Sequence, residues 1–105
     1  MGFLQYWGNW IRSQRKARGY TVDDFSKLTN VSINQIHHIE RGDADSRKET
    51  LERIINVLGD ENAYNAIVSY VEQNIHDYTP LIQALEQLPP EERSKGIQKI
   101  FSIIT

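Results

Sequence analysis

Amide, imidazole and guanidinium side chains crowd one short stretch of this chain, between residues 32 and 48. An Asn or Gln amide donates and accepts hydrogen bonds at once, which matches the N6 and N7 edge of adenine, whereas Ser, Thr, His, Lys and Arg suit phosphate oxygens. These residue types alone would indicate a soluble surface, but on the exposed side of a short helix they favour recognition of double-stranded DNA. The candidates for base contacts are Ile33, Asn34, Gln35 and His38, and those for phosphate contacts are Thr21, Ser32, His37, Arg41, Arg47 and Lys48.

Asn34 is the foremost candidate for reading a base, because a bidentate amide contact with adenine discriminates by about 1 to 3 kcal/mol. Gln35 can make the same contact unless its side chain turns back to cap the helix at Ser32. Ile33 falls in the first turn of the predicted helix, where it either meets a thymine methyl group or extends the hydrophobic core. His38 lies one turn beyond Asn34 and suits a base or a phosphate; the alternative is an imidazole that faces solvent.

The neighbouring imidazoles of His37 and His38 do not suit a metal site, because consecutive side chains on a helix point about 100° apart and cannot share one ion comfortably. The chain also has no Cys, no glycine-rich phosphate loop and no nucleophile motif. The sequence therefore predicts neither an enzyme nor a bound metal or cofactor.

Three segments carry the sequence pattern of a capping box, in which a Ser or Thr is followed three residues later by an acidic or amide residue. The hydroxyl accepts a hydrogen bond from an amide of the first helical turn, the later side chain reaches back, and the loss of such a cap costs about 1 kcal/mol. The segments are Thr21–Asp24, Ser32–Gln35 and Ser46–Glu49, so the sequence predicts a helix start at each.

The turn between the first two of these helices comprises Thr29, Asn30 and Val31. Asn tolerates the left-handed backbone that ends a helix sharply. A link this short makes the helices cross steeply and leaves one side of the second helix unburied, which in a DNA-binding helix-turn-helix enters the major groove. The predicted shared core consists of Phe25, Leu28, Val31, Ile36 and Ile39.

Three groups of residues between Trp7 and Gly59 follow a known pattern. They are Ile11-Arg12, Arg15 and Gly19 in and after the first helix, Glu40-Arg41-Gly42 at the end of the second short helix, and Thr50-Leu51 through Leu58-Gly59 in a closing helix. Together they resemble the lambda-repressor-like helix-turn-helix domains of the Cro and XRE type, over about half of the chain. The resemblance implies an all-helical fold in which the helix from Ser32 to Glu40 reads DNA.

The resemblance also implies a structural ion pair between Arg15 and Glu40, which ties the first helix to the end of the reading helix; the alternative is two solvated charges. Breaking a buried pair from one side costs roughly 3 to 5 kcal/mol.

The chain departs from the family most seriously at Val22. Phage repressors often carry a Gln there that helps to read the first base pairs, so this contact is missing here.

Charge is distributed unevenly along the chain, which has a net charge of −2 and a pI of about 5.9. Residues 1–59 carry nine Lys and Arg against seven Asp and Glu, whereas residues 60–105 carry three against seven. Asp43 and Asp45 follow the reading helix and oppose phosphate. We therefore expect modest non-specific affinity and a dependence on dimer formation for tight binding.

The sequence beyond Gly59 stays helical in pattern, with an apolar stripe of Tyr64, Ile67, Val68, Val71 and Ile75 and with helix starts at Thr79-Pro80 and Pro89-Pro90. We expect residues 1–59 to form the DNA-binding domain and residues 60–105 to form a helical extension. This extension is expected to join a homodimer whose two reading helices lie about 34 Å apart. The expected dimer or tail interface consists of Trp10, Ile97, Ile100, Phe101 and Ile104.

No apolar stretch approaches the roughly 20 residues needed to cross a bilayer, and the N-terminus lacks a signal-peptide pattern. With no Cys in the chain, these features predict a cytoplasmic protein without a membrane association.

Taken together, the motifs and the resemblance predict an all-α, dimeric, sequence-specific transcriptional regulator, with repression as the expected effect. The alternative is a protein-interaction module whose helical tail binds a partner such as a toxin or an antirepressor.

Overall fold

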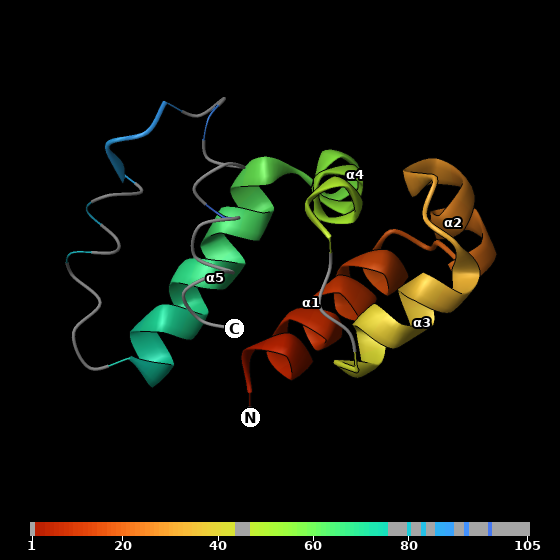
Figure 1. Cartoon of the computed structure of the whole chain (residues 1–105), viewed down its shortest axis with the longest axis horizontal. Coiled ribbons are helices and arrows are strands. Elements are labelled where there is room, and N and C mark those ends of the chain that lie inside the picture. Colours follow the sequence, from red (N-terminus) through yellow and green to blue (C-terminus); the bar gives the residue numbers. More distant parts are fainter. Residues whose placement is uncertain are drawn as a thin grey trace. The chain divides into compact units, whose positions relative to one another are not determined.

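The computed structural model describes residues 2–43 and 47–75, together with residues 80, 83, 86–89, 92 and 97; of Lys48 it describes the backbone alone. Within these ranges the helices are α1 (Phe3–Ala17), α2 (Val22–Thr29), α3 (Ile33–Arg41), α4 (Lys48–Leu58) and α5 (Asp60–Asn74), as Figure 1 shows. These ranges contain no strand, and the predicted all-helical class is confirmed. The chain divides between Leu58 and Gly59 into two units, and each is described by itself.

The starts of α2 and α3 are capped by hydroxyl side chains, as predicted. Thr21 Oγ1 accepts a hydrogen bond from Asp24 N at 3.1 Å, and the Asp24 carboxylate accepts one from Thr21 N at 3.1 Å, which completes a capping box. Ser32 Oγ accepts a bond from Gln35 N at 3.1 Å, but among the described residues the Gln35 side chain makes no return bond. The third predicted box begins at Ser46, which lies outside the described residues.

The capping box makes the stability of α2 depend on the charge of Asp24. Hydrogen bonding by Thr21, chiefly through its backbone amide, lowers the pKa of the Asp24 carboxyl. A carboxyl with a depressed folded pKa stabilises the fold above its unfolded pKa, near 4, and this effect is lost as pH falls through the folded pKa.

We therefore expect Asp24→Asn to unfold at a lower temperature than the wild type at pH 7, with the difference closing below about pH 4. Thermal unfolding followed by circular dichroism over this pH range measures the effect. A difference that stays the same at low pH would show that the charge of Asp24 is not its cause.

A left-handed residue ends α2, as the sequence predicts. Asn30 has φ 59° and ψ 34°, and in the described part of the chain it is the only non-glycine residue with a positive φ. Hydroxyl groups close the turn around it, since Ser26 Oγ donates to Val31 O at 2.6 Å and Thr29 Oγ1 donates to Phe25 O at 2.7 Å. Short-range bonds therefore fix the path from α2 into α3.

The core of the first unit is built from α1, α2, α3 and α4. Phe25, Ile36 and Ile39 are at most 2% exposed and Val31 is 5% exposed, so these predicted core residues are confirmed. The other fully buried large side chains of this unit are Trp7, Ile11, Leu51, Ile54, Ile55 and Leu58.

The prediction that Leu28 joins this core is wrong, because its side chain is 52% exposed. Successive residues turn a helix by about 100°, so Thr29 lies about 40° from Phe25 while Leu28 lies about 60° away on the opposite flank. The buried side of α2 continues through Thr29, which is 3% exposed and bonds to the Phe25 carbonyl. The spacing from Phe25 to Leu28 is helical, but it does not say which flank is buried.

The backbones of α1 and α3 meet at Gly8. A Cβ added to Gly8 would overlap Ile39 O and would lie 2.8 Å from Glu40 O. A Cβ added to Gly42, just after α3, would lie 2.8 Å from Gln5 Cα, and Gly42 has a φ of 75° in the left-handed region. These two glycines let α3 lie directly on α1 and so set the direction in which its other side points.

α5 is the described helix of the second unit, and it begins with Asp60 and Glu61, whose charges suit a helix start. It ends at Asn74, and its buried residues are Ala63, Tyr64, Ala66, Ile67, Tyr70 and Val71. Of the predicted apolar stripe, Val68 and Ile75 are half-buried. The helical segments predicted after Thr79 lie largely outside the described residues. In the part of the chain that the structure describes, no helix is both long and apolar enough to span a membrane.

Candidate nucleic-acid interface

A buried ion pair anchors α3 to α1. Arg15 Nε donates to Glu40 Oε2 at 2.8 Å, Nη2 donates to Glu40 Oε1 at 3.0 Å, and Nη1 donates to Tyr20 O at 2.9 Å. The two side chains are 9% and 7% exposed. The hydrogen bonds to Glu40 raise the pKa of Arg15 against the opposing effect of burial, so the guanidinium stays charged. The structure thus brings together the two residues expected to pair, and they hold the last turn of α3 and the loop before α2 on α1.

α3 presents a polar side to solvent. Because each residue turns the helix by about 100°, Asn34 and His38 lie near the middle of the side opposite the buried Ile36. Ile33 is 41% exposed, so it is not a core residue, and Gln35 is half-buried on one flank. The exposed residues are the cap Ser32 and, within α3, Ile33, Asn34, His37, His38 and Arg41.

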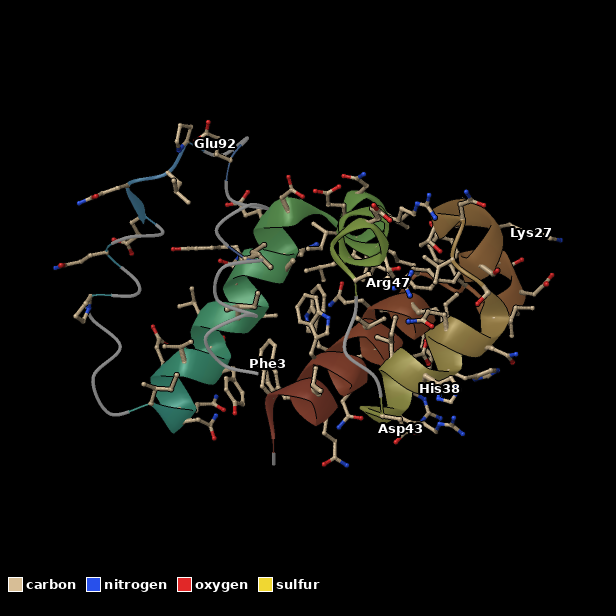
Figure 2. All side chains as sticks on the ribbon, viewed as in Figure 1. Phe3, Lys27, His38, Asp43, Arg47 and Glu92 are labelled. Carbon is tan, nitrogen blue, oxygen red and sulfur yellow. The ribbon has the colours of Figure 1, made fainter. Side chains whose placement is uncertain are left out.

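His38 and Arg41 lie in a polar cluster with Asp43 at the end of α3, where Figure 2 shows His38 and Asp43 close together. Arg41 Nε lies 3.0 Å from Asp43 Oδ2, and Arg41 Nη2 lies 3.1 Å from His38 Nδ1. His38 Nδ1 lies 4.0 Å from the same carboxylate oxygen. Asp43 therefore offsets the charge of Arg41, and a phosphate that approaches Arg41 must compete with this carboxylate.

The other candidates for phosphate contacts lie around α3 on separate elements. Thr21 and Ser32 are the exposed caps of α2 and α3, and the Asp24 carboxylate lies beside Thr21. Arg47 is exposed and, with Ser32, lines a pocket of about 250 Å³ beside the start of α3. Lys48 begins α4, and its side chain is outside what the structure describes.

A second pocket, of about 200 Å³, lies between α1, α3 and the first residue of α2, and we call it the cationic pocket. It is lined by Arg12, Arg15, Val22, His37, Glu40 and Arg41. Phosphate contacts were predicted for His37 and Arg41, whereas Arg12 was named only as part of the family pattern. The available signal was its position three residues before Arg15, which places both on the same side of α1.

The residues expected at the dimer or tail interface are only partly described. Trp10 is half-buried and stacks on Trp7, with ring centroids 4.9 Å apart and an angle of 21° between the planes. Ile97 is fully buried within the single chain. Ile100, Phe101 and Ile104 lie outside the described residues.

The described residues do not form a metal site. In this part of the chain no three His, Cys, Asp or Glu side chains are grouped so that they could hold a metal ion. His37 and His38 are both exposed on α3.

The profile of the helix-turn-helix family matches residues 11–61. This range contains α2, α3 and α4 and both members of the ion pair between Arg15 and Glu40. It therefore includes the exposed side of α3.

Similar proteins come from archaea and bacteria. A protein of Saccharolobus islandicus (strain M.14.25 / Kamchatka #1), provisionally named as an HTH-type transcriptional regulatory protein, is 27% identical over 77 residues, which cover 67% of this chain and 25% of that protein. YazB of Bacillus subtilis (strain 168), an uncharacterised HTH-type transcriptional regulator, is 32% identical over 62 residues, which cover 56% of this chain and 90% of YazB. The chain thus spans about a quarter of the length of the archaeal relative. No solved structure matches the chain significantly.

Proposed function

Because the chain belongs to the helix-turn-helix family of transcriptional regulators, we propose that it is a dimeric repressor that binds a specific DNA sequence with α3 in the major groove. The family membership confirms the resemblance predicted from the sequence motifs. The sign of regulation, the dimer and the groove are our inferences.

The exposed polar side of α3 is the observation that carries this proposal. Base-edge contacts need side chains held at set positions on a rigid element. α3 meets this requirement, because its buried side is fixed by the ion pair of Arg15 with Glu40 and by the backbone contact at Gly8. Its other side leaves Asn34 and His38 in solvent.

Each exposed group on and around α3 has a proposed role that follows from its chemistry. Asn34 binds an adenine edge through its amide, and Ile33 contacts a thymine methyl group. Gln35 and His38 supply further base contacts, and the Gln35 side chain is available because it makes no return bond to the Ser32 amide among the described residues. The phosphate contacts are assigned to Thr21, Ser32, His37, Arg41, Arg47 and Lys48.

We further propose that residues 60–105 join two copies of the chain, with Trp10 as a contributor from α1. A single helix-turn-helix reads one half-site, whereas a two-fold dimer presents two reading helices about 34 Å apart on one face of the duplex. The two-fold symmetry predicts a palindromic site, and the spacing predicts half-sites about one helical turn apart.

Selection from a random duplex pool at about 0.15 M salt tests the proposal, with wild type and Asn34→Ala side by side. The wild type is expected to enrich a palindromic motif, and Asn34→Ala is expected to lose preference at one symmetric position, worth about 1 to 3 kcal/mol. The matched control is Asn56→Ala, which removes the same amide from an exposed position of α4 and should leave the motif unchanged.

Two results would contradict this reading. An equal loss of affinity for all sequences in Asn34→Ala would remove Asn34 from the base contacts and leave it as a general contact. The absence of any enriched motif with the wild type would instead favour a protein partner bound through residues 60–105.

A further inference from the structure

Basic side chains line the cationic pocket, and one part of its lining has no polar side-chain atoms. Arg12 lines it from α1, and His37 and Arg41 line it from α3. Val22, the first residue of α2, supplies the apolar wall. The three basic residues are exposed, so their polar ends are accessible to a ligand from solvent.

The remaining lining residues add no net charge to the pocket. Arg15 and Glu40 neutralise each other through their bidentate ion pair. Arg41 shares its charge with Asp43 at 3.0 Å. Arg12 forms no ion pair with any carboxylate in the described ranges. Arg12 is therefore the least compensated cation of the pocket, and the balance of charge favours an anion.

We propose that the cationic pocket binds one phosphate group of the duplex backbone and that Arg12 is its principal donor. This inference rests on the proposed function. A guanidinium donates two parallel N–H groups to two phosphate oxygens. An apolar wall offers no side-chain acceptor that would compete for these N–H groups. The volume of about 200 Å³ has room for a phosphate group and a few waters, because one water takes about 30 Å³.

The place of the pocket on α3 favours a backbone phosphate over a free one. His37 and Arg41 lie toward one flank of the exposed side whose middle holds Asn34 and His38. When a helix lies in the major groove, its flanks face the phosphates that border the groove. Val22 has no polar side-chain group with which to make such a contact, so the donor comes from α1 instead.

Titration of a labelled duplex against wild type, Arg12→Gln and Lys27→Gln at about 0.05 to 0.2 M salt tests this assignment by fluorescence anisotropy. Lys27 is the matched control, because it is also an exposed helical cation and it lines neither the cationic pocket nor the pocket beside Arg47. A second arm adds inorganic phosphate to each protein without DNA and follows the His37 ring by NMR. This arm separates a free phosphate from a backbone phosphate.

Arg12→Gln is expected to weaken binding of all sequences about fivefold at 0.15 M salt and to reduce the log–log salt slope by about 0.9, the effect of one lost phosphate contact. Lys27→Gln should keep the wild-type slope, and inorganic phosphate should bind only weakly. Equal slopes for Arg12→Gln and Lys27→Gln would overturn the phosphate assignment while the salt-dependent binding of the wild type still supported the proposed function.

A different result would contradict the proposed function, namely that the wild type itself shows no salt-dependent binding to duplex DNA. Tight binding of inorganic phosphate that is lost in Arg12→Gln would then assign the pocket to a small phosphorylated ligand, and the backbone assignment would be wrong.

Discussion

Gly8→Ala is expected to cost the protein about 3 kcal/mol of folding stability. The added Cβ would overlap Ile39 O and approach Glu40 O to 2.8 Å, and both are backbone atoms of α3 that cannot turn away as a side chain can. Relief requires α1 and α3 to separate, which exposes the core between them. The total stability of a small domain is about 0.05 to 0.15 kcal/mol per residue, so this loss is a large fraction of it.

The expected loss of stability is opposite in sign to the usual effect of replacing Gly by Ala in a helix. In an exposed helix interior, Gly to Ala stabilises by about 1 kcal/mol because alanine has the higher helix propensity. Urea unfolding followed by tryptophan fluorescence measures the change. The matched control is Gly2→Ala, since a Cβ at Gly2 meets nothing within 4 Å and its backbone suits any residue. A Gly8→Ala variant as stable as the wild type would show that α1 and α3 do not meet at their backbones.

Glu40→Gln is expected to cost about 3 kcal/mol, because it leaves the buried charge of Arg15 without its counter-ion. Glutamine keeps the size of the side chain and one acceptor. The loss of folding stability is therefore due to the missing charge and one missing hydrogen bond. The double variant Arg15→Met with Glu40→Gln should be less destabilised than the sum of the two single variants, because no buried charge then remains uncompensated. Chemical unfolding of the four proteins completes this cycle.

The exposed ion pair of Asp23 and Lys27 is the control for the buried one. It spans 3.2 Å, but its side chains are 60% and 77% exposed, so Lys27→Gln should change stability by less than about 1 kcal/mol. If Glu40→Gln also changed stability this little, the link between Arg15 and Glu40 would be too weak to hold α3 on α1.

Those features of the first unit that depend on local interactions could be predicted from the sequence. The capping box at Thr21 and the left-handed Asn30 involve atoms within a few residues of each other, and the residue types alone specify them. The alternation of buried and exposed positions along α3 likewise follows from helical periodicity.

Features set by tertiary packing could not be predicted in the same way. Leu28 and Thr29 both follow Phe25 at a helical spacing, and the choice between them depends on which flank of α2 faces the core. The closeness of α1 and α3 at Gly8 depends on the crossing of two helices that are separated in the chain by the 15 residues from Arg18 to Ser32. Neither signal is present in a local pattern.

The candidate site shows the same division. The residue types around α3 pointed to DNA contacts, and the exposed positions of Asn34 and His38 follow from periodicity. The convergence of Arg12 with His37 and Arg41 around Val22 joins three helices, so it required the structure. The ion pair of Arg41 with Asp43 also required the structure, because the sequence shows that the two residues are close in the chain but not that their side chains are in contact.

The stacking of Trp7 on Trp10 gives this protein a built-in optical reporter. Two indoles 4.9 Å apart and inclined by 21° couple their electronic transitions, and coupled transitions of this kind produce circular dichroism bands of their own in the far ultraviolet. The ellipticity at the wavelengths used for helices will therefore contain a contribution from this ring pair. Since both rings sit on α1, on either side of Gly8, recording the coupled band and the helical band together distinguishes local fraying of α1 from unfolding of the whole unit.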